Sequence, residues 1–290
     1  MALKMSKKGL LRVSEIFYSL QGEGLYTGTP SLFMRTFGCN FTCSGFGMPK
    51  GELSKERELV DPSKYKTYDD LPLVHTGCDS YPSWDIRFKH LSPMLDVKAI
   101  VDRMQELLPD GKFGNVHLVI TGGEPLLGWQ KQYPALLKEI YKRDMDLGFV
   151  TFETNGTQKL SEDLINTLND YKDFLEVTFS ISSKLSSSGE KWKEAIRPDN
   201  VSTYFAITNS KHYFKWVCTS PDDLQDVQKA EQEYKQAGIK IPIYLMPCGG
   251  TEKLYLKNQH WLAKICLANG YRYSQRLHLN LFGKIGRAHV

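Results

Sequence analysis

Short runs of β-branched or aromatic residues alternate along the chain with longer stretches of helical periodicity. Between residues 97 and 108 the apolar side chains recur at spacings of three and four, which is typical of a helix with one face on a core. A second helix is predicted to start at Ser220, as an N-cap before Pro221, and to end near Gly238. The other predicted helices are residues 133–143, 161–168 and 257–269. The predicted strands are residues 31–37, 116–121, 148–153, 175–182, 212–218, 241–246 and 277–282.

This alternation of strands and helices predicts βαβ units and a mostly parallel sheet of the α/β class. Five or six such units are enough for a partial or a full β/α barrel. Ligands of these sheets bind where the strands end, at the carboxyl edge. We therefore expect the functional residues to follow directly after the predicted strands.

Residues 44–92 interrupt the alternation, because they show no clear periodicity and contain several glycines and prolines. Structureless stretches of this length are uncommon in compact domains and usually have a function. We interpret the segment as an insertion in a binding loop of a single domain that covers residues 1–290.

Composition excludes few functions, but it argues against a nucleic-acid-binding protein and against a membrane protein. The net charge of the 290 residues is +4 and the basic residues are dispersed, which gives no strong case for binding nucleic acid or a membrane surface. The basic start of the chain lacks the apolar stretch of a secretory signal, and no apolar run approaches the roughly 18 residues of a membrane span. We expect a cytoplasmic protein without a nucleic-acid or membrane partner.

The six cysteines fall into different surroundings. Cys218 and Cys266 lie in apolar stretches and are expected to be buried as small hydrophobic residues. Cys39 and Cys43 lie four residues apart after a predicted strand, and Cys78 lies in the irregular segment. Thiolates are the usual ligands of iron–sulfur clusters, so these three indicate a cluster or metal site. A structural zinc site or a pair of core cysteines remains an alternative.

Residues 119–125 form a β-branched strand that runs into Gly122, Gly123, Glu124 and Pro125. Glycines at such a turn let a ligand approach the backbone closely. The carboxylate of Glu124 would be able to accept hydrogen bonds from an ammonium group. The alternative is an ordinary βα turn.

At these residues the chain resembles the radical S-adenosylmethionine (SAM) superfamily and, within it, the 7-carboxy-7-deazaguanine synthase family. The resemblance spans residues from about 13 to about 286. It is carried by residues 15–24 with 28–30 and 33–35, by the Cys39/Cys43 loop with 78–80, by 121–125 with 153–157, and by 276–283. The fold that it implies is a partial (β/α)6-type TIM barrel, the radical SAM core.

The chain departs from the superfamily pattern CxxxCxxC, because the third position is Phe46. We align Cys78, Asp79 and Ser80 with the Cys-Asp-Thr of the family and treat residues 45–77 as inserted. The resemblance then implies that Cys39, Cys43 and Cys78 hold one [4Fe–4S] cluster and leave one iron open for SAM. His75 is the competitor of Cys78 for the third position.

The resemblance also implies a substrate, 6-carboxy-5,6,7,8-tetrahydropterin, and a magnesium ion beside it. Arg35 would hold the substrate carboxylate through paired hydrogen bonds. Ser80 would supply the hydroxyl ligand of magnesium. The ring would be met by Leu20, Gln21, Gly22 and Thr121.

For SAM the resemblance implies a set of residues at three strand ends. Gly123 and Glu124, after Gly122, would meet its amino group, and Thr154 with Asn155 would reach its ribose or methionine part. Residues 182–184 match the Ser-Pro-Lys of the family without its proline. The predicted set is therefore Gly122, Gly123, Glu124, Thr154, Asn155, Ser182, Ser183 and Lys184.

The implied reaction is a radical ring contraction that gives 7-carboxy-7-deazaguanine and releases ammonia. The family further implies an electron donor such as flavodoxin and a homodimer. Two alternatives remain open: a different radical SAM enzyme, such as a glycyl-radical activase, and a degenerate member that only binds partners. The sequence does not decide whether the product serves tRNA queuosine or a DNA modification.

Overall fold

The computed structural model describes residues 9–249 and 252–282. Its centre is one nine-stranded sheet in the order β3-β1-β2-β4-β5-β6-β7-β8-β9. From β2 onward all neighbouring strands are parallel, whereas β1 is antiparallel to both β2 and β3. The strands are β1 (Leu10–Leu20), β2 (Pro30–Thr36), β3 (Met94–Asp96), β4 (His117–Gly122), β5 (Phe149–Thr154), β6 (Glu176–Ile181), β7 (Ser210–Cys218), β8 (Ile243–Pro247) and β9 (Arg272–Tyr273).

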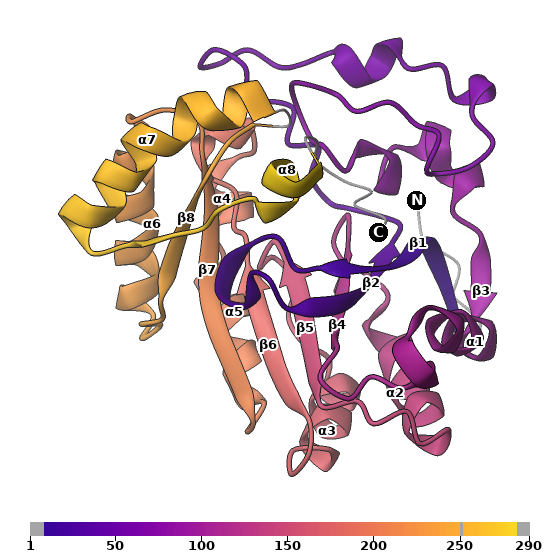
Figure 1. The fold of residues 1–290 in the computed structure, drawn as a ribbon. Coiled ribbons are helices and arrows are strands. Elements are labelled where there is room, and N and C mark those ends of the chain that lie inside the picture. The colour runs from indigo at the N-terminus through magenta and orange to yellow at the C-terminus, as the bar shows by residue number, and fades with distance from the viewer. Residues whose placement is uncertain (1–8, 250–251, 283–290) are drawn as a thin grey trace.

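The helices follow the strands in the expected alternation. Asp96 caps the first of them, since its side chain accepts from the backbone N–H of Ala99 at 2.8 Å. Figure 1 shows the parallel strands side by side with helices around them. The helices are α1 (Val97–Leu107), α2 (Tyr133–Lys142), α3 (Glu162–Asp170), α4 (Trp192–Ala195), α5 (Pro198–Val201), α6 (Asp223–Gln236), α7 (Glu252–Asn269) and α8 (Leu277–Phe282).

Alternate strand residues face the two sides of the sheet. The side that faces the helices is apolar and belongs to the main hydrophobic core, as Ile120, Phe152 and Phe179 illustrate. The intervening residues, among them Glu153, Ser180 and Lys215, line a cavity on the other side. The sheet therefore separates a packed core from a polar interior.

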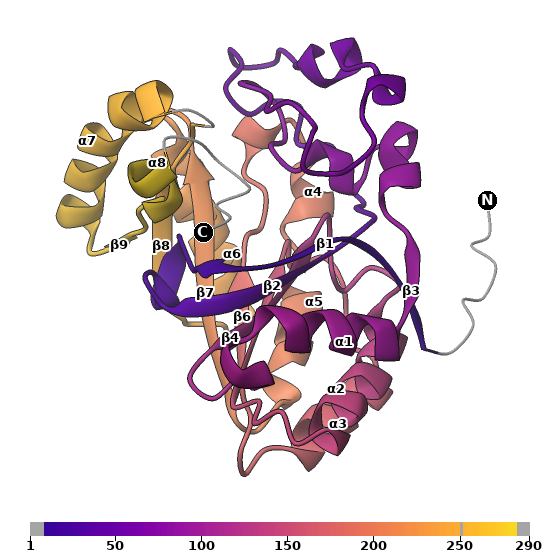
Figure 2. The same ribbon diagram turned by 45° about the vertical axis from the view of Figure 1, so that its right-hand side comes forward.

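Residues 44–92 form irregular chain with short 3-10 helices and an apolar cluster of their own. The cluster consists of Tyr68, Leu71, Val74, Tyr81, Phe88 and Leu91. Arg57 and Arg87 both pair with the buried carboxylate of Asp85, at 2.8 and 2.7 Å. Figures 1 and 2 show this segment, in purple, across one end of the parallel strands. Several of its residues line the cavity at the carboxyl ends of the strands.

The parallel sheet and six of the seven predicted strands are confirmed to within about two residues. The prediction of a strand at 277–282 is wrong, because these residues form α8. Leu277, Leu279 and Leu281 alternate as in a strand, but only Leu279 is buried, against Tyr255. The predicted start of a helix at Ser220 is also wrong, since α6 begins at Asp223, whose carboxylate accepts from the backbone N–H of Thr219.

The predictions about membrane spans and about the two ends of the chain can be compared with the structure only over the described residues. No helix among residues 9–249 and 252–282 combines the length and apolarity needed to cross a bilayer. The basic residues 1–8 and Gly283, the last residue of the tail motif, lie outside the described part of the chain.

Candidate active site

Three chain segments enclose the cavity at the carboxyl edge of the sheet. The strand ends form its walls, residues 68–84 of the irregular segment contribute one side, and Arg276 with His278 contribute another. All but two of the predicted site residues line this cavity. They are Leu20, Gln21, Gly22, Arg35, Cys39, Cys43, Cys78, Ser80, Thr121, Gly122, Gly123, Thr154, Asn155, Ser182 and Lys184.

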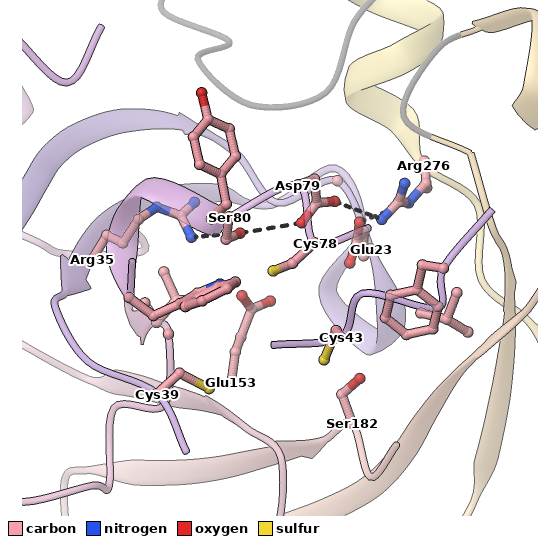
Figure 3. Close-up of a pocket in the computed structure, with 18 of the residues that line it drawn as sticks. Glu23, Arg35, Cys39, Cys43, Cys78, Asp79, Ser80, Glu153, Ser182 and Arg276 are labelled. Carbon is pink, nitrogen blue, oxygen red and sulfur yellow. Dashed lines mark hydrogen bonds and ion pairs between the residues drawn. The ribbon is translucent and has the colours of Figure 1, made fainter. Parts of the chain in front are cut away.

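The three predicted cluster ligands come together from two distant parts of the chain. Cys39 and Cys43 lie on the loop after β2, and Cys43 adopts a left-handed backbone conformation with φ of 48°. Cys78 returns to them because the backbone N–H of Gly77 donates to the carbonyl of Phe46 at 2.7 Å. Figure 3 shows the three sulfur atoms around the same space. Cys39 and Cys78 pack on a small cluster that contains Cys43.

The three thiols lie in largely buried surroundings. Burial raises the pKa of Cys39 to about 12 and that of Cys78 to about 11, so the bare thiols stay protonated near neutral pH. Iron would supply the positive charge that their thiolates need.

His75, the competitor of Cys78, also lines the cavity but is exposed. Its backbone N–H donates to Glu56 Oε1 at 2.8 Å. Cys78 is partly buried and packs with the other two cysteines. The geometry favours Cys78 over His75.

Arg35 lies on β2, lines the cavity and points toward Ser80 (Figure 3). Its Nε donates to Glu15 Oε1 at 2.6 Å, and its Nη1 donates to Ser80 Oγ at 3.4 Å. Ser80 Oγ in turn donates to Asp79 Oδ1 at 3.2 Å. A guanidinium fixed in this way presents its remaining N–H groups to the cavity, where they can receive a carboxylate.

Gly122 and Gly123 bring the turn after β4 against the cluster loop. A Cβ atom on Gly123 would lie 2.4 Å from the carbonyl oxygen of Gly38 and 2.8 Å from the Cβ of Cys39. The backbone N–H of Glu124 donates to the same carbonyl at 2.7 Å. Glycine is therefore required at 123 for the two loops to meet.

The side chain of Glu124 is buried beside the cavity lining in this structure, and its predicted contact with the amino group of SAM stays a prediction. Glu124 is fully buried and accepts from Thr154 Oγ1 at 2.7 Å, from the backbone N–H of Asn155 at 2.6 Å and from that of Leu126 at 3.0 Å. Burial raises the pKa of this carboxyl group in spite of the three donors. Its role in the structure is to fix the loop after β5.

Ser183 turns away from the cavity. It is buried, and its hydroxyl lies 2.7 Å from that of Tyr234 on α6. The neighbouring Lys184 does line the cavity and donates to Ser182 Oγ at 3.1 Å. Successive residues after a strand point in opposite directions, so only two of these three reach the cavity.

A chain of buried charges was not predicted from the sequence. Lys215 Nζ lies 2.7 Å from Glu23 Oε2 and 3.4 Å from Glu153 Oε1. Arg276 pairs with Glu23 at 3.2 Å and with Asp79 at 3.3 Å. Burial acts to lower the pKa of Lys215, but the two carboxylates raise it above its usual value.

The sequence held one signal for this chain, a lysine inside the apolar run 213–217. Lysine is almost never fully buried unless it is paired, so Lys215 requires acidic partners. Those partners come from β5 and from the loop after β1, which no local pattern identifies.

No family model matches the chain, but curated proteins similar to it share one name. The 7-carboxy-7-deazaguanine synthase of Methanopyrus kandleri is 30% identical over 243 residues, 83% of this chain and 82% of that protein. The enzyme of the same name from Halobacterium salinarum is 30% identical and covers 94% of this chain and 90% of its own length. The crystal structure of QueE from Escherichia coli matches with a TM-score of 0.50 at 18% identity, over 93% of this chain and 95% of that one, which supports the fold.

Proposed function

The chain belongs to the 7-carboxy-7-deazaguanine synthase family of radical SAM lyases, and on this premise we propose that it contracts 6-carboxy-5,6,7,8-tetrahydropterin to 7-carboxy-7-deazaguanine with loss of ammonia. The observation that carries the proposal is the convergence of Cys39, Cys43 and Cys78 on one cavity that also holds Arg35. A cavity of this composition can hold a cluster beside an organic anion.

Cys39, Cys43 and Cys78 would hold the cluster, which would supply the electron for the reductive cleavage of SAM and so the radical chemistry at C6 of the substrate. The protein has to position SAM and the substrate relative to each other and to exclude water from the cavity. Arg35, held by Glu15, binds the substrate carboxylate and so fixes the position of C6. Tyr68, Leu73 and Val74 line the cavity from the 44–92 segment and cover it on that side.

The binding of SAM is assigned to strand ends that line the cavity. Lys184, next to Ser182, presents an ammonium group for the SAM carboxylate. Gly122 and Gly123 line the cavity and are assigned to SAM through their backbone atoms. Thr154 and Asn155 are held by Glu124 and keep their loop in contact with the cavity. Leu20, Gln21, Gly22 and Thr121 are assigned to the pterin ring.

We further propose that Ser80 binds a magnesium ion only when the substrate is present, because the substrate supplies some of the ligands of the ion. Ser80 Oγ and Asp79 are the oxygen donors nearby, and Arg35 donates to the same hydroxyl. Magnesium usually retains several waters and binds one or two carboxylates with its substrate. The sites of this chain would therefore bind magnesium weakly without the pterin.

The remaining assignments follow from the family. The sheet is proposed to be the partial (β/α)6 barrel, supported by the unbroken parallel order from β2 to β8. We also propose a single domain with an insertion at 44–92, a cytoplasmic location, an electron donor such as flavodoxin, and a homodimer.

The proposal is tested by anaerobic incubation of the reconstituted protein with SAM, reductant, magnesium and 6-carboxytetrahydropterin, followed by mass analysis. The expected products are 7-carboxy-7-deazaguanine, ammonia, methionine and 5′-deoxyadenosine. Formation of 5′-deoxyadenosine without the deazaguanine would indicate a different radical SAM enzyme. A colourless protein with about one zinc ion per chain would indicate a non-catalytic member with a structural site.

A further inference from the structure

Arg276 joins three chain segments at the edge of the cavity. It lies just before α8, its side chain is 8% exposed, and its Nη1 donates to the backbone carbonyl of Gly249 at 2.6 Å. Its Nη2 donates to Asp79 Oδ2 at 3.3 Å, and its Nε pairs with Glu23 Oε1 at 3.2 Å. Figure 3 shows Arg276 and Asp79 in line with Ser80 and Arg35.

The two acidic partners of Arg276 differ in what else holds them. Glu23 retains a second cation, because Lys215 Nζ lies 2.7 Å from its other oxygen. Asp79 forms no other ion pair with the described residues, and its side chain is 34% exposed. Removal of the guanidinium should therefore disturb Asp79 much more than Glu23.

Asp79 directly follows Cys78, so a disturbance there acts on the third cluster ligand. Cys43 has an anchor of its own, since Glu190 Oε1 accepts from the backbone N–H of Thr42 at 2.8 Å and from that of Cys43 at 2.7 Å. Within residues 9–249 and 252–282, no hydrogen bond or ion pair joins Glu190 to Arg276. Cys78 is joined to the Cys39/Cys43 loop through the bond between Gly77 and Phe46, and it has a second anchor, which that loop does not share, in the Asp79–Arg276 pair.

We infer that Arg276 is a positioning residue that holds Cys78 in place through Asp79, so that the C-terminal part of the chain sets the third ligand of the cluster. The inference rests on the cluster of the proposed function. It gives the Arg276–Asp79 pair a role in cluster retention and none in direct contact with the substrate.

The test measures how fast an anaerobic chelator removes iron from the reconstituted protein, and which cysteine is alkylated first as iron leaves. We expect Arg276→Gln to release iron about tenfold faster, since a charged hydrogen bond is lost. Cys78 should be labelled first, with Cys39 and Cys43 labelled at the normal rate. The matched control is Arg272→Gln, which removes an exposed arginine that bonds to Tyr244 Oη at 2.9 Å and should leave both measurements unchanged.

A double-mutant cycle separates positioning from general support of the fold. In an Asp79→Asn background, Arg276→Gln should add little, because the interaction is already lost. If Arg276→Gln does not fold, Arg276→Lys serves as the test instead. Lysine keeps the positive charge but lacks the several N–H donors of the guanidinium, so iron should be released at a rate between those of the wild type and Arg276→Gln.

Unchanged iron release in either variant would overturn the inference, as would equal labelling of all three cysteines or additive effects in the cycle. Failure of the wild-type chain to take up iron at all would instead contradict the proposed function. The two failures are therefore distinguishable.

Discussion

At the scale of single residues, Glu124 shows that a sequence motif can locate a turn without showing which partners its side chain has. The strand-to-glycine pattern located the turn, and Gly122 and Gly123 do line the cavity. The carboxylate itself is buried behind them and accepts from Thr154, Asn155 and Leu126. A sequence gives no sign of which way a side chain points once the chain has turned.

Glu124→Gln should therefore lower stability rather than abolish SAM binding outright. An amide at this position directs its own N–H toward groups that are already donors. We expect the free energy of unfolding to fall by about 1–3 kcal/mol, measured by anaerobic denaturant titration. Glu106→Gln, at an exposed side chain paired with Arg103, is the control and should change little. Equal stability of the two variants would show that the buried carboxylate has no such role.

At the scale of elements, the parallel strands were predictable because they are largely buried runs rich in β-branched or aromatic residues, most of which alternate with helical patterns. The antiparallel β1 was missed, since polar residues such as Glu15 and Ser19 interrupt its pattern on the cavity side. The strand assigned to residues 277–282 failed because a run of six residues with alternate leucines fits a strand as well as a short helix. Contacts with Tyr255 and with Gly22, which lie far away in sequence, decide that case.

The turn after β4 provides a test at this scale. In Gly123→Ala the added methyl group would lie 2.4 Å from the carbonyl oxygen of Gly38, so the turn and the cluster loop must separate. We expect a loss of about 1–3 kcal/mol in stability and a lower iron content after reconstitution. Gly148→Ala is the matched control, because the nearest atom to its added Cβ lies 4.0 Å away. Normal iron binding by Gly123→Ala would mean that the two loops need not meet.

At the scale of the whole molecule, the site is assembled from parts that no local pattern connects. The rule that ligands bind at the carboxyl edge predicted where the strand-end residues would gather. It did not predict that residues 68–84 would line the cavity from above or that Arg276 would reach Asp79. These contacts arise from the path of the irregular segment, for which the sequence shows no periodicity, and from that of the C-terminal part, where alternate leucines favoured a strand.

The central claim is that Cys78, brought back by the 44–92 segment, completes the cluster site with Cys39 and Cys43. The most direct measurement compares Cys78→Ala with His75→Ala after anaerobic reconstitution, by iron content and by 5′-deoxyadenosine formed from SAM under reducing conditions. The account predicts that Cys78→Ala loses the cluster and the cleavage of SAM, whereas His75→Ala, at an exposed position, retains both. A Cys78→Ala protein with full iron and normal cleavage of SAM would contradict it.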